Sequence, residues 1–184
     1  MVGELGPFDP IRIEADDNRW DSRCSLRFGP VLSPTHDELV ETPWGDLRVL
    51  FAQQGIYSAY FADSRAPRGL REPPGLIVNR RGQTWDLARL FEQVDVLCWG
   101  TPFQRLVWAT LVTLPAGVTC TYGALAQRLG RPSAVRAVAN AVANNPVGLL
   151  IPCHRVLPAS RGVGSYRWGA ERKAAILHWE LHCH

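Results

Sequence analysis

Ile151-Pro152-Cys153-His154-Arg155-Val156 is the stretch around which this chain is organised. The apolar residues 147–151 lead into it and predict a short buried segment that ends at Pro152. The next two residues place a thiol and an imidazole at the end of a rigid support, which is what covalent catalysis by cysteine requires. An isolated Cys-His pair is more often a core cysteine beside a surface histidine, so the surrounding residues must decide between the two interpretations.

The composition predicts a globular protein of one ordinary domain or two small packed halves, because the chain has 184 residues. Hydrophobic residues make up 46% and charged residues 20%, which is not the balance of a disordered chain. The formal net charge is only +3. Any role with nucleic acid must therefore depend on a local patch rather than on the field of the whole molecule.

The five cysteines are Cys24, Cys98, Cys120, Cys153 and Cys183. Their odd number and irregular spacing favour a reducing compartment over a disulfide framework. The start of the chain lacks a signal-like apolar core, and no apolar run is long enough to cross a bilayer. We therefore expect a cytoplasmic protein without membrane contact. His182, Cys183 and His184 make a poor metal site at a chain end, so neither metal nor cofactor is expected.

The first half of the chain divides near residue 41. Residues 1–40 are rich in charge, proline and glycine, and we expect an extension of unknown role there. From residue 41 to 98 we expect an amino-terminal α/β domain. Its elements are a β-hairpin from 47–51 to 56–61 across Gln54-Gly55, an exposed loop over 63–75, a short helix over 87–91 and a strand over 94–98.

The second half, residues 99–184, is dominated by helical patterns. Thr101-Pro102-Phe103-Gln104 carries the residues of a helix start, and apolar residues recur at helical spacing as far as Leu114. Helices are predicted over 121–129 and 133–144, and the Gly-Arg-Pro between them suggests a helix-turn-helix.

The second of these two helices has two contrasting faces. Val135, Val138 and Val142 are predicted to form its buried arc. Arg136 and Asn140 lie on the other side among alanines, where Lys and Glu would be usual for a solvated face. Such a face fits close contact with a DNA groove or a tight contact with another helix. In the last helix, over 170–181, Ala170, Ala174, Leu177 and Leu181 form the predicted apolar stripe, with Glu180 at its border.

Together, Asn145-Pro146 and Pro152-Cys153-His154-Arg155-Val156 resemble the active-site signature of the O6-alkylguanine-DNA alkyltransferases. The similarity runs from about Gly100 to Glu180, is weaker over 42–99 and is absent before that. The resemblance implies an α+β fold, with a small ribonuclease H-like amino-terminal α/β half and a helical winged helix-turn-helix carboxy-terminal half. The middle of the chain is shorter than is usual in this family.

The resemblance also implies a set of catalytic residues. Cys153 would take the alkyl group irreversibly, so that one molecule repairs one lesion. His154 would act as the base through a water, with Glu180 orienting it. Asn145 matches the family's hinge asparagine, and Tyr122 matches a tyrosine that faces guanine N3 and can donate a proton.

The substrate is expected to be O6-alkylguanine in double-stranded DNA, rotated out of the duplex and approached through the minor groove. Tyr122, Tyr166 and Trp168, with the backbones of Val156 and Arg167, would form its pocket. Arg136 would occupy the space that the base leaves. Ala134, Ala137, Ala139 and Asn140 would contact DNA. We expect a monomer associated with the nucleoid.

The same residues allow three other functions. A lesion-binding protein without chemistry is disfavoured, because the nucleophile is present. A transcriptional regulator that senses alkylation is disfavoured, because the cysteine-rich zinc module of some bacterial relatives is missing. An acceptor of alkyl groups from a small molecule stays open.

Overall fold

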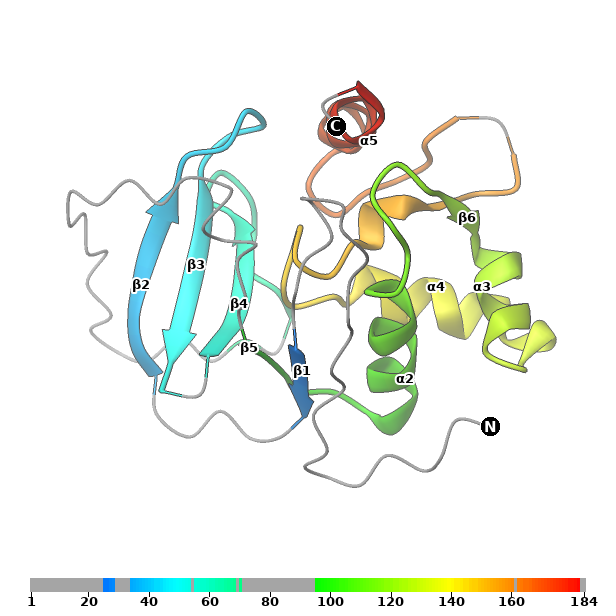
Figure 1. Cartoon of the computed structure of the whole chain (residues 1–184), viewed down its shortest axis with the longest axis horizontal. Coiled ribbons are helices and arrows are strands. Elements are labelled where there is room, and N and C mark those ends of the chain that lie inside the picture. Colours follow the sequence, from blue (N-terminus) through cyan, green and yellow to red (C-terminus); the bar gives the residue numbers. More distant parts are fainter. Residues whose placement is uncertain are drawn as a thin grey trace.

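The computed structural model describes residues 25–28, 34–53, 55–68, 70, 95–160 and 162–182. They form a mixed α/β structure in which a five-stranded sheet lies to one side of a group of helices (Figure 1). The short helix predicted over 87–91, residues 71–75 of the predicted loop and residues 183–184 lie outside the described parts of the chain. Among the described helices, none combines the length and the apolar character needed to cross a membrane.

The sheet contains β1 (Ser25–Phe28), β2 (Pro34–Val40), β3 (Leu47–Ala52), β4 (Gly55–Phe61) and β5 (Asp95–Cys98). Its strand order is β1-β5-β4-β3-β2, with β5 parallel to both of its neighbours and β3 antiparallel to β2 and β4. The predicted hairpin is confirmed as β3 and β4, and the strand predicted over 94–98 is confirmed as β5. A register shift at Leu50/Phe51 breaks the expected alternation, so that Leu50 is buried and Phe51 is partly exposed.

Two strands fall within residues 1–40, where the sequence predicted only an extension. β1 pairs with β5, and β2 forms the edge beside β3. The prediction missed β2 because a charged residue occupies an inward position: Asp37 is fully buried and its carboxylate lies 2.6 Å from Arg48 Nε. An ion pair at a core position removes the apolar alternation by which strands are recognised.

The helices follow the sheet along the chain. They are α2 (Pro102–Leu111), α3 (Tyr122–Arg128), α4 (Val135–Ala143) and α5 (Ala170–His182), with short 3-10 turns η1 (Pro132–Ala134) and η2 (Cys153–Arg155). Two short strands, β6 (Cys120–Thr121) and β7 (Val156–Leu157), pair in parallel. The predicted start of α2 is confirmed as a capping box: Gln104 N donates to Thr101 Oγ1, and Thr101 N donates to Gln104 Oε1.

The buried face of α4 differs from the prediction. Val138 and Val142 are buried with Ala141, whereas Val135 is 37% exposed. Val135 is the first residue of α4, directly after η1. Further along α4, Trp108 of α2 contacts the helix, because its Nε1 donates to the Ala141 carbonyl at 2.9 Å.

The buried face of α5 was predicted only in part: within the predicted stripe, Leu177 is buried as expected. Ala170 is exposed and Leu181 is 64% exposed, while the buried residues are Lys173, Ile176, Leu177 and Glu180. These four recur at helical spacing, but two of them are charged. A search for a purely apolar stripe therefore selected a neighbouring face.

The guanidinium of Arg172 joins α5 to the sheet. Its Nε donates to the Trp44 carbonyl at 2.9 Å, its Nη2 lies 2.7 Å from Asp63 Oδ2, and its charge lies 4.1 Å from the centre of the Phe61 ring. The Trp44 and Trp179 rings also meet edge to face at 5.3 Å. These contacts hold the two parts of the molecule in one arrangement, and the candidate site lies where they meet.

Candidate active site

The segment before Cys153 is an extension of the sheet. Gly148 N donates to the Ala59 carbonyl at 2.7 Å, and Ala59 N donates to the Pro146 carbonyl at 3.1 Å, so that residues 146–148 run along β4. The Ser58 hydroxyl adds a third hydrogen bond to Pro146 at 3.0 Å. The buried segment predicted over 147–151 is confirmed, and it rests on a strand from the other half of the molecule.

Asn145 closes the turn that leads to the cysteine. Its amide nitrogen donates to the Ile151 carbonyl at 2.8 Å and to Cys153 Sγ at 3.1 Å, while its oxygen accepts from Val147 N at 2.9 Å. Within this turn Leu149 has φ 65°, a conformation that costs energy for a residue with a side chain. One buried side chain therefore fixes the backbone and also touches the sulfur.

The Cys153 thiol is 5% exposed, at the first residue of η2. Burial raises the pKa of the thiol, and the hydrogen bond from Asn145, the nearby Tyr166 hydroxyl and the charges of Lys173 and Arg167 offset only part of this rise. The resting sulfur is therefore protonated at neutral pH. A nucleophilic thiolate forms only when a base takes the proton.

Behind the cysteine lies a buried cluster of His154, Arg155 and Glu180. His154 Nε2 lies 2.7 Å from Glu180 Oε1, and Arg155 donates to the same carboxylate from Nε and from Nη2, the latter at 2.9 Å. Gly117 N adds a contact of 3.3 Å, and Arg155 Nη1 also donates to the Leu114 carbonyl. Each of the three residues is at most 6% exposed.

The charges in this cluster determine which nitrogen of His154 is basic. Burial alone would raise the pKa of Glu180, but the hydrogen bonds and charges of His154 and Arg155 outweigh it and lower that pKa to about 2. Burial lowers the pKa of His154, so its ring is neutral. An ionised carboxylate only accepts hydrogen bonds, so Nε2 carries the proton and Nδ1 is free to accept one. Nδ1 is buried, and no described residue hydrogen-bonds to it.

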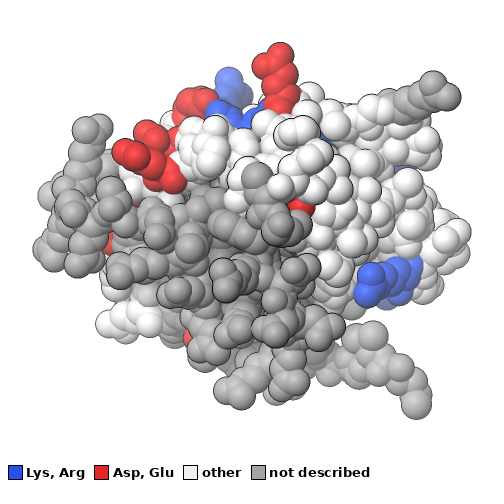
Figure 2. Space-filling view, turned by 45° about the horizontal axis from the view of Figure 1, so that its top comes forward, with Lys and Arg blue, Asp and Glu red and all other residues white. Residues whose placement is uncertain are grey.

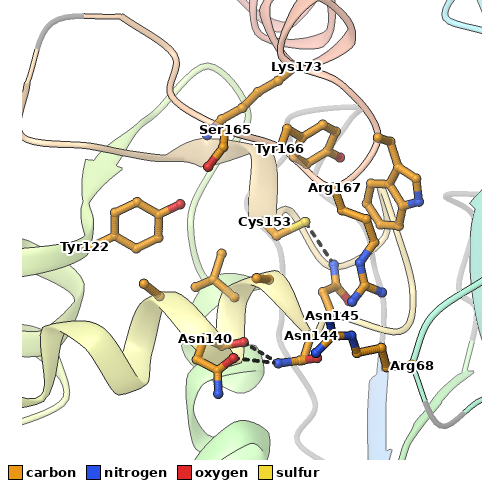
Figure 3. Close-up of a pocket in the computed structure, with 14 residues that line it drawn as sticks. Arg68, Tyr122, Asn140, Asn144, Asn145, Cys153, Ser165, Tyr166, Arg167 and Lys173 are labelled. Atoms are coloured by element: carbon orange, nitrogen blue, oxygen red, sulfur yellow. Dashed lines mark hydrogen bonds between the residues drawn. The ribbon is translucent and has the colours of Figure 1, made fainter. Parts of the chain in front are cut away.

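In front of the cysteine is a cavity of about 600 Å³, a volume typical of small-ligand sites. Cys153 lies between Tyr122, at the start of α3, and Arg167, in the segment before α5 (Figure 3). Burial raises the pKa of Tyr122, and the nearby Cys153 raises it further. The phenol is therefore protonated and able to donate into the cavity.

The wall of the cavity opposite α4 is formed by residues 165–168, which we call the front wall. Trp168 is 4% exposed and packs edge to face against Phe61 at 6.0 Å and Tyr166 at 5.1 Å. Three buried atoms here have no hydrogen-bond partner among the described residues: Tyr166 Oη, Arg167 Nη1 and Trp168 Nε1.

The structure separates the sequence-predicted residues into three groups. The cavity is lined by Cys153, Asn145, Tyr122, Tyr166, Arg167, Trp168, Ala139 and Asn140. Buried behind it lie His154, Glu180 and Val156. On the outer surface around the start of α4 lie Ala134, Arg136 and Ala137, which do not line the cavity.

Sequence reasoning missed three residues of the site. Arg155 was noted only as part of the signature, although it neutralises Glu180. Lys173 is 1% exposed, lines the cavity and donates to the Val156 carbonyl at 2.7 Å. Its helical spacing with Ile176 and Glu180 was a usable signal. Arg68 also lines the cavity, and nothing in its loop distinguishes it from the neighbouring arginines.

Comparisons with known proteins indicate one family of methyltransferases. The family described as "6-O-methylguanine DNA methyltransferase, DNA binding domain" matches residues 102–182. A probable methylated-DNA–protein-cysteine methyltransferase of Acanthamoeba polyphaga mimivirus is 37% identical over 146 residues, which are 78% of this chain and 95% of that protein.

One further relative matches only part of this chain, and one solved structure has a similar fold. The bifunctional transcriptional activator/DNA repair enzyme Ada of Escherichia coli is 49% identical over 81 residues, which are 44% of this chain and only 23% of Ada. The structure of Mycobacterium tuberculosis OGT in complex with DNA superimposes with a TM-score of 0.64 at 28% identity, covering 80% of this chain and 93% of that one.

Proposed function

The chain belongs to the methylated-DNA–protein-cysteine methyltransferase family, and we propose that it repairs DNA by moving the alkyl group of O6-alkylguanine onto Cys153. The observation that carries this proposal is the placement of Cys153. Its sulfur faces a cavity of ligand size and accepts a hydrogen bond from Asn145. The next residue, His154, is buried and paired with Glu180. The transfer uses up the protein, because a thioether is not readily reversed.

The reaction is a single displacement at the alkyl carbon. The Cys153 proton passes through a water to His154 Nδ1, the nitrogen that has no partner in the described chain. The thiolate sulfur then bonds to the alkyl carbon, the bond from that carbon to O6 breaks, and the electron pair stays on the guanine. Tyr122 lies across the cavity and donates a proton to the leaving base.

The charges around the sulfur support this sequence of steps. Positive charges on Lys173 and Arg167 favour the thiolate, whereas burial opposes it. Glu180 stabilises the imidazolium that forms on His154, since the two groups are 2.7 Å apart. Arg155 holds the carboxylate in place and keeps it ionised.

We propose that DNA is held by a winged helix-turn-helix built on α3 and α4. The exposed face of α4 carries Arg136 and Asn140 among alanines, which allows close approach to a minor groove. Arg136 fills the space of the flipped nucleotide. Ala134, Ala137 and Ala139 contact the strand beside it.

We propose that the chain is organised in two halves. Residues 41–98 form a ribonuclease H-like half that supports the nucleophile through β4, and residues 99–184 form the DNA-binding half. Residues before 41 complete the sheet of the first half with β1 and β2. We also propose that the protein acts as a monomer in the cytoplasm, in contact with the nucleoid that holds its substrate.

The test is the intact mass of the protein after incubation with a duplex that contains O6-methylguanine. We expect the gain of one methyl group, mapped to Cys153, and no gain for Cys153→Ala. Cys120→Ala is the matched control, because Cys120 is a half-buried cysteine outside the cavity and should leave the gain unchanged. Methylation of the Cys153→Ala protein would show that another group is the nucleophile.

A further inference from the structure

The mouth of the cavity carries two guanidinium groups from different halves of the molecule. Arg68 lies in the loop after β4, Arg167 lies in the front wall, and both line the cavity. Figure 3 shows the two side chains on the same side of the pocket. Burial lowers the pKa of Arg167, the nearby Cys153 opposes this change, and the positive charge of Arg68 lowers the pKa again. Two like charges are thus held near each other.

Nothing in the described chain neutralises this pair. No Asp or Glu is among the described residues that line the cavity, and Arg167 Nη1 is buried without a hydrogen-bond partner among them. Three other guanidiniums are each matched by a carboxylate, in the pairs Arg48–Asp37, Arg155–Glu180 and Arg172–Asp63. A buried donor left unsatisfied is costly, so this site is built for an acceptor that a ligand supplies.

We propose that Arg68 and Arg167 together bind a phosphodiester group of the DNA strand beside the flipped nucleotide, an inference that rests on the proposed function. Two adjacent positive charges require a negative ligand, and the edges of a base are neutral. A phosphate supplies the charge and the paired oxygens that match the guanidinium fork.

The depth of the cavity agrees with a phosphate at this point. The alkyl carbon must reach Cys153, which is 5% exposed at the inner end of the cavity. The base therefore enters the cavity while its sugar and phosphate stay at the mouth. Arg68 is exposed at that mouth, and so the amino-terminal half contacts the DNA directly.

A local phosphate site matters in a molecule with little overall charge. The formal net charge is +3, and Figure 2 shows basic and acidic side chains in small separate groups on the described surface of the face that it presents. Binding to DNA cannot depend on a broad basic field here. Individual phosphate contacts therefore account for a large share of the affinity and of its dependence on salt.

The test compares Arg68→Ala with Arg65→Ala. Arg65 is an exposed arginine of the same loop that does not line the cavity, so the two variants lose the same charge. The second-order rate of methyl transfer to Cys153 is measured with a methylated duplex at several salt concentrations and with free O6-methylguanine base. Arg68→Lys is included because it keeps the charge but not the fork.

We expect Arg68→Ala to lower the duplex rate roughly tenfold at low salt, as for loss of a charged hydrogen bond. Because the second-order rate includes binding of the duplex, the dependence of log rate on log salt should become shallower by up to about 0.9, the value for one phosphate contact. Arg68→Lys should recover part of the rate, and the free base should react equally with all variants.

Equal duplex rates and salt slopes for Arg68→Ala and Arg65→Ala would overturn the phosphate site. A loss of the same size with the free base would also overturn it, because the free base has no phosphate. Both outcomes leave transfer to Cys153 intact. Failure of the unsubstituted protein to accept a methyl group from either donor would instead contradict the proposed function.

Discussion

The two sides of Cys153 differ in how their polar groups are satisfied. Behind it, the Glu180 carboxylate accepts hydrogen bonds from His154, Arg155 and the backbone of Gly117. In front of it, the front wall presents three buried donors that lack partners in the described chain. Among the described residues, only His154 Nδ1 of the cluster behind Cys153 lacks a partner. The fully paired carboxylate adds rigidity to the fold, whereas the unsatisfied donors of the front wall cost folding energy until a ligand pairs with them.

This difference separates stability from activity. Variants behind Cys153 should lower both the free energy of unfolding and the rate of alkyl transfer. Removing an unpaired polar group from the front wall should change the rate with little loss of stability.

The largest effect is expected for Glu180→Ala. This change leaves the guanidinium of Arg155 buried without its carboxylate, and breaking a buried pair from one side costs about 3–5 kcal/mol. Urea denaturation gives the free energy of unfolding. Glu171→Ala on the exposed face of α5 is the control and should cost less than about 1 kcal/mol. A loss for Glu180→Ala as small as that of the control would mean that the cluster does not stabilise the fold.

Acid should destabilise the protein through the same cluster. The pKa of Glu180 is about 2 in the folded state against an ordinary 4.5, so its stabilisation is complete above pH 4.5 and is lost as the pH falls towards 2. At 1.36 kcal/mol for each pH unit, this amounts to about 3 kcal/mol. The lowered pKa of His154 acts in the same direction below pH 6.5, because the unfolded chain takes up the proton first.

Urea denaturation at pH 7, 5.5, 4.5, 3.5 and 2.5 measures this slope. Glu180→Gln removes the titrating carboxylate, and its unfolding free energy should depend less on pH below 4.5 than that of the unsubstituted protein. Equal slopes in the two proteins would place the acid sensitivity elsewhere.

The sequence predicted those features that depend on neighbours along the chain. The capping box at Thr101, the hairpin and the buried run before Cys153 each follow from a few adjacent residues. The candidate catalytic residues were named because Asn145, Cys153 and His154 lie within one short signature. The structure then shows that Tyr122 and Tyr166 share a cavity with Cys153.

The sequence could not predict features that depend on contacts between distant segments. Asp37 lies within the extension predicted over residues 1–40, but its pair with Arg48 buries it in strand β2. Lys173 can be buried because it donates to the Val156 carbonyl. Glu180 can be buried because His154 and Arg155 hydrogen-bond to its carboxylate. Arg68 reaches the cavity from a loop of the other half. A charged residue in a sequence usually indicates an exposed position. Pairing with a distant segment allows these charged residues to be buried instead.

In the front wall, Trp168→Gly should speed the reaction with O6-benzylguanine. The indole lines the cavity and is held between Phe61 and Tyr166, so a benzyl group must displace it. It also packs so closely on Gly148 that a Cβ there would lie 2.6 Å from the ring. Relief of such overpacking is worth about 1–3 kcal/mol, or roughly ten- to a hundredfold in rate.

The methylated duplex is the internal control for this variant, since a methyl group fits without displacing the ring. The second-order rates of both donors are compared in both proteins. A benzyl rate unchanged by Trp168→Gly would mean that the indole does not limit the size of the pocket.

The smallest effect on stability is expected for Tyr166→Phe, which removes a buried hydroxyl from the front wall. That hydroxyl has no hydrogen-bond partner in the described chain, so its loss should change the free energy of unfolding by less than about 1 kcal/mol.

The rate of methyl transfer should respond more strongly to Tyr166→Phe. In the resting protein the thiol is protonated and the hydroxyl makes no hydrogen bond to it. Once Cys153 is ionised, the hydroxyl can donate to the sulfur, which lowers the pKa of the thiol, so the variant should need a higher pH for the same rate. The measurement is the rate of methyl transfer from the duplex between pH 6 and 9, together with urea denaturation at pH 7. The rise of rate with pH should move to higher pH, with the two proteins converging at the alkaline end. A stability loss as large as that of Glu180→Ala, without a shift of the pH profile, would show that the front wall is structural and that the contrast between the two sides of Cys153 is wrong.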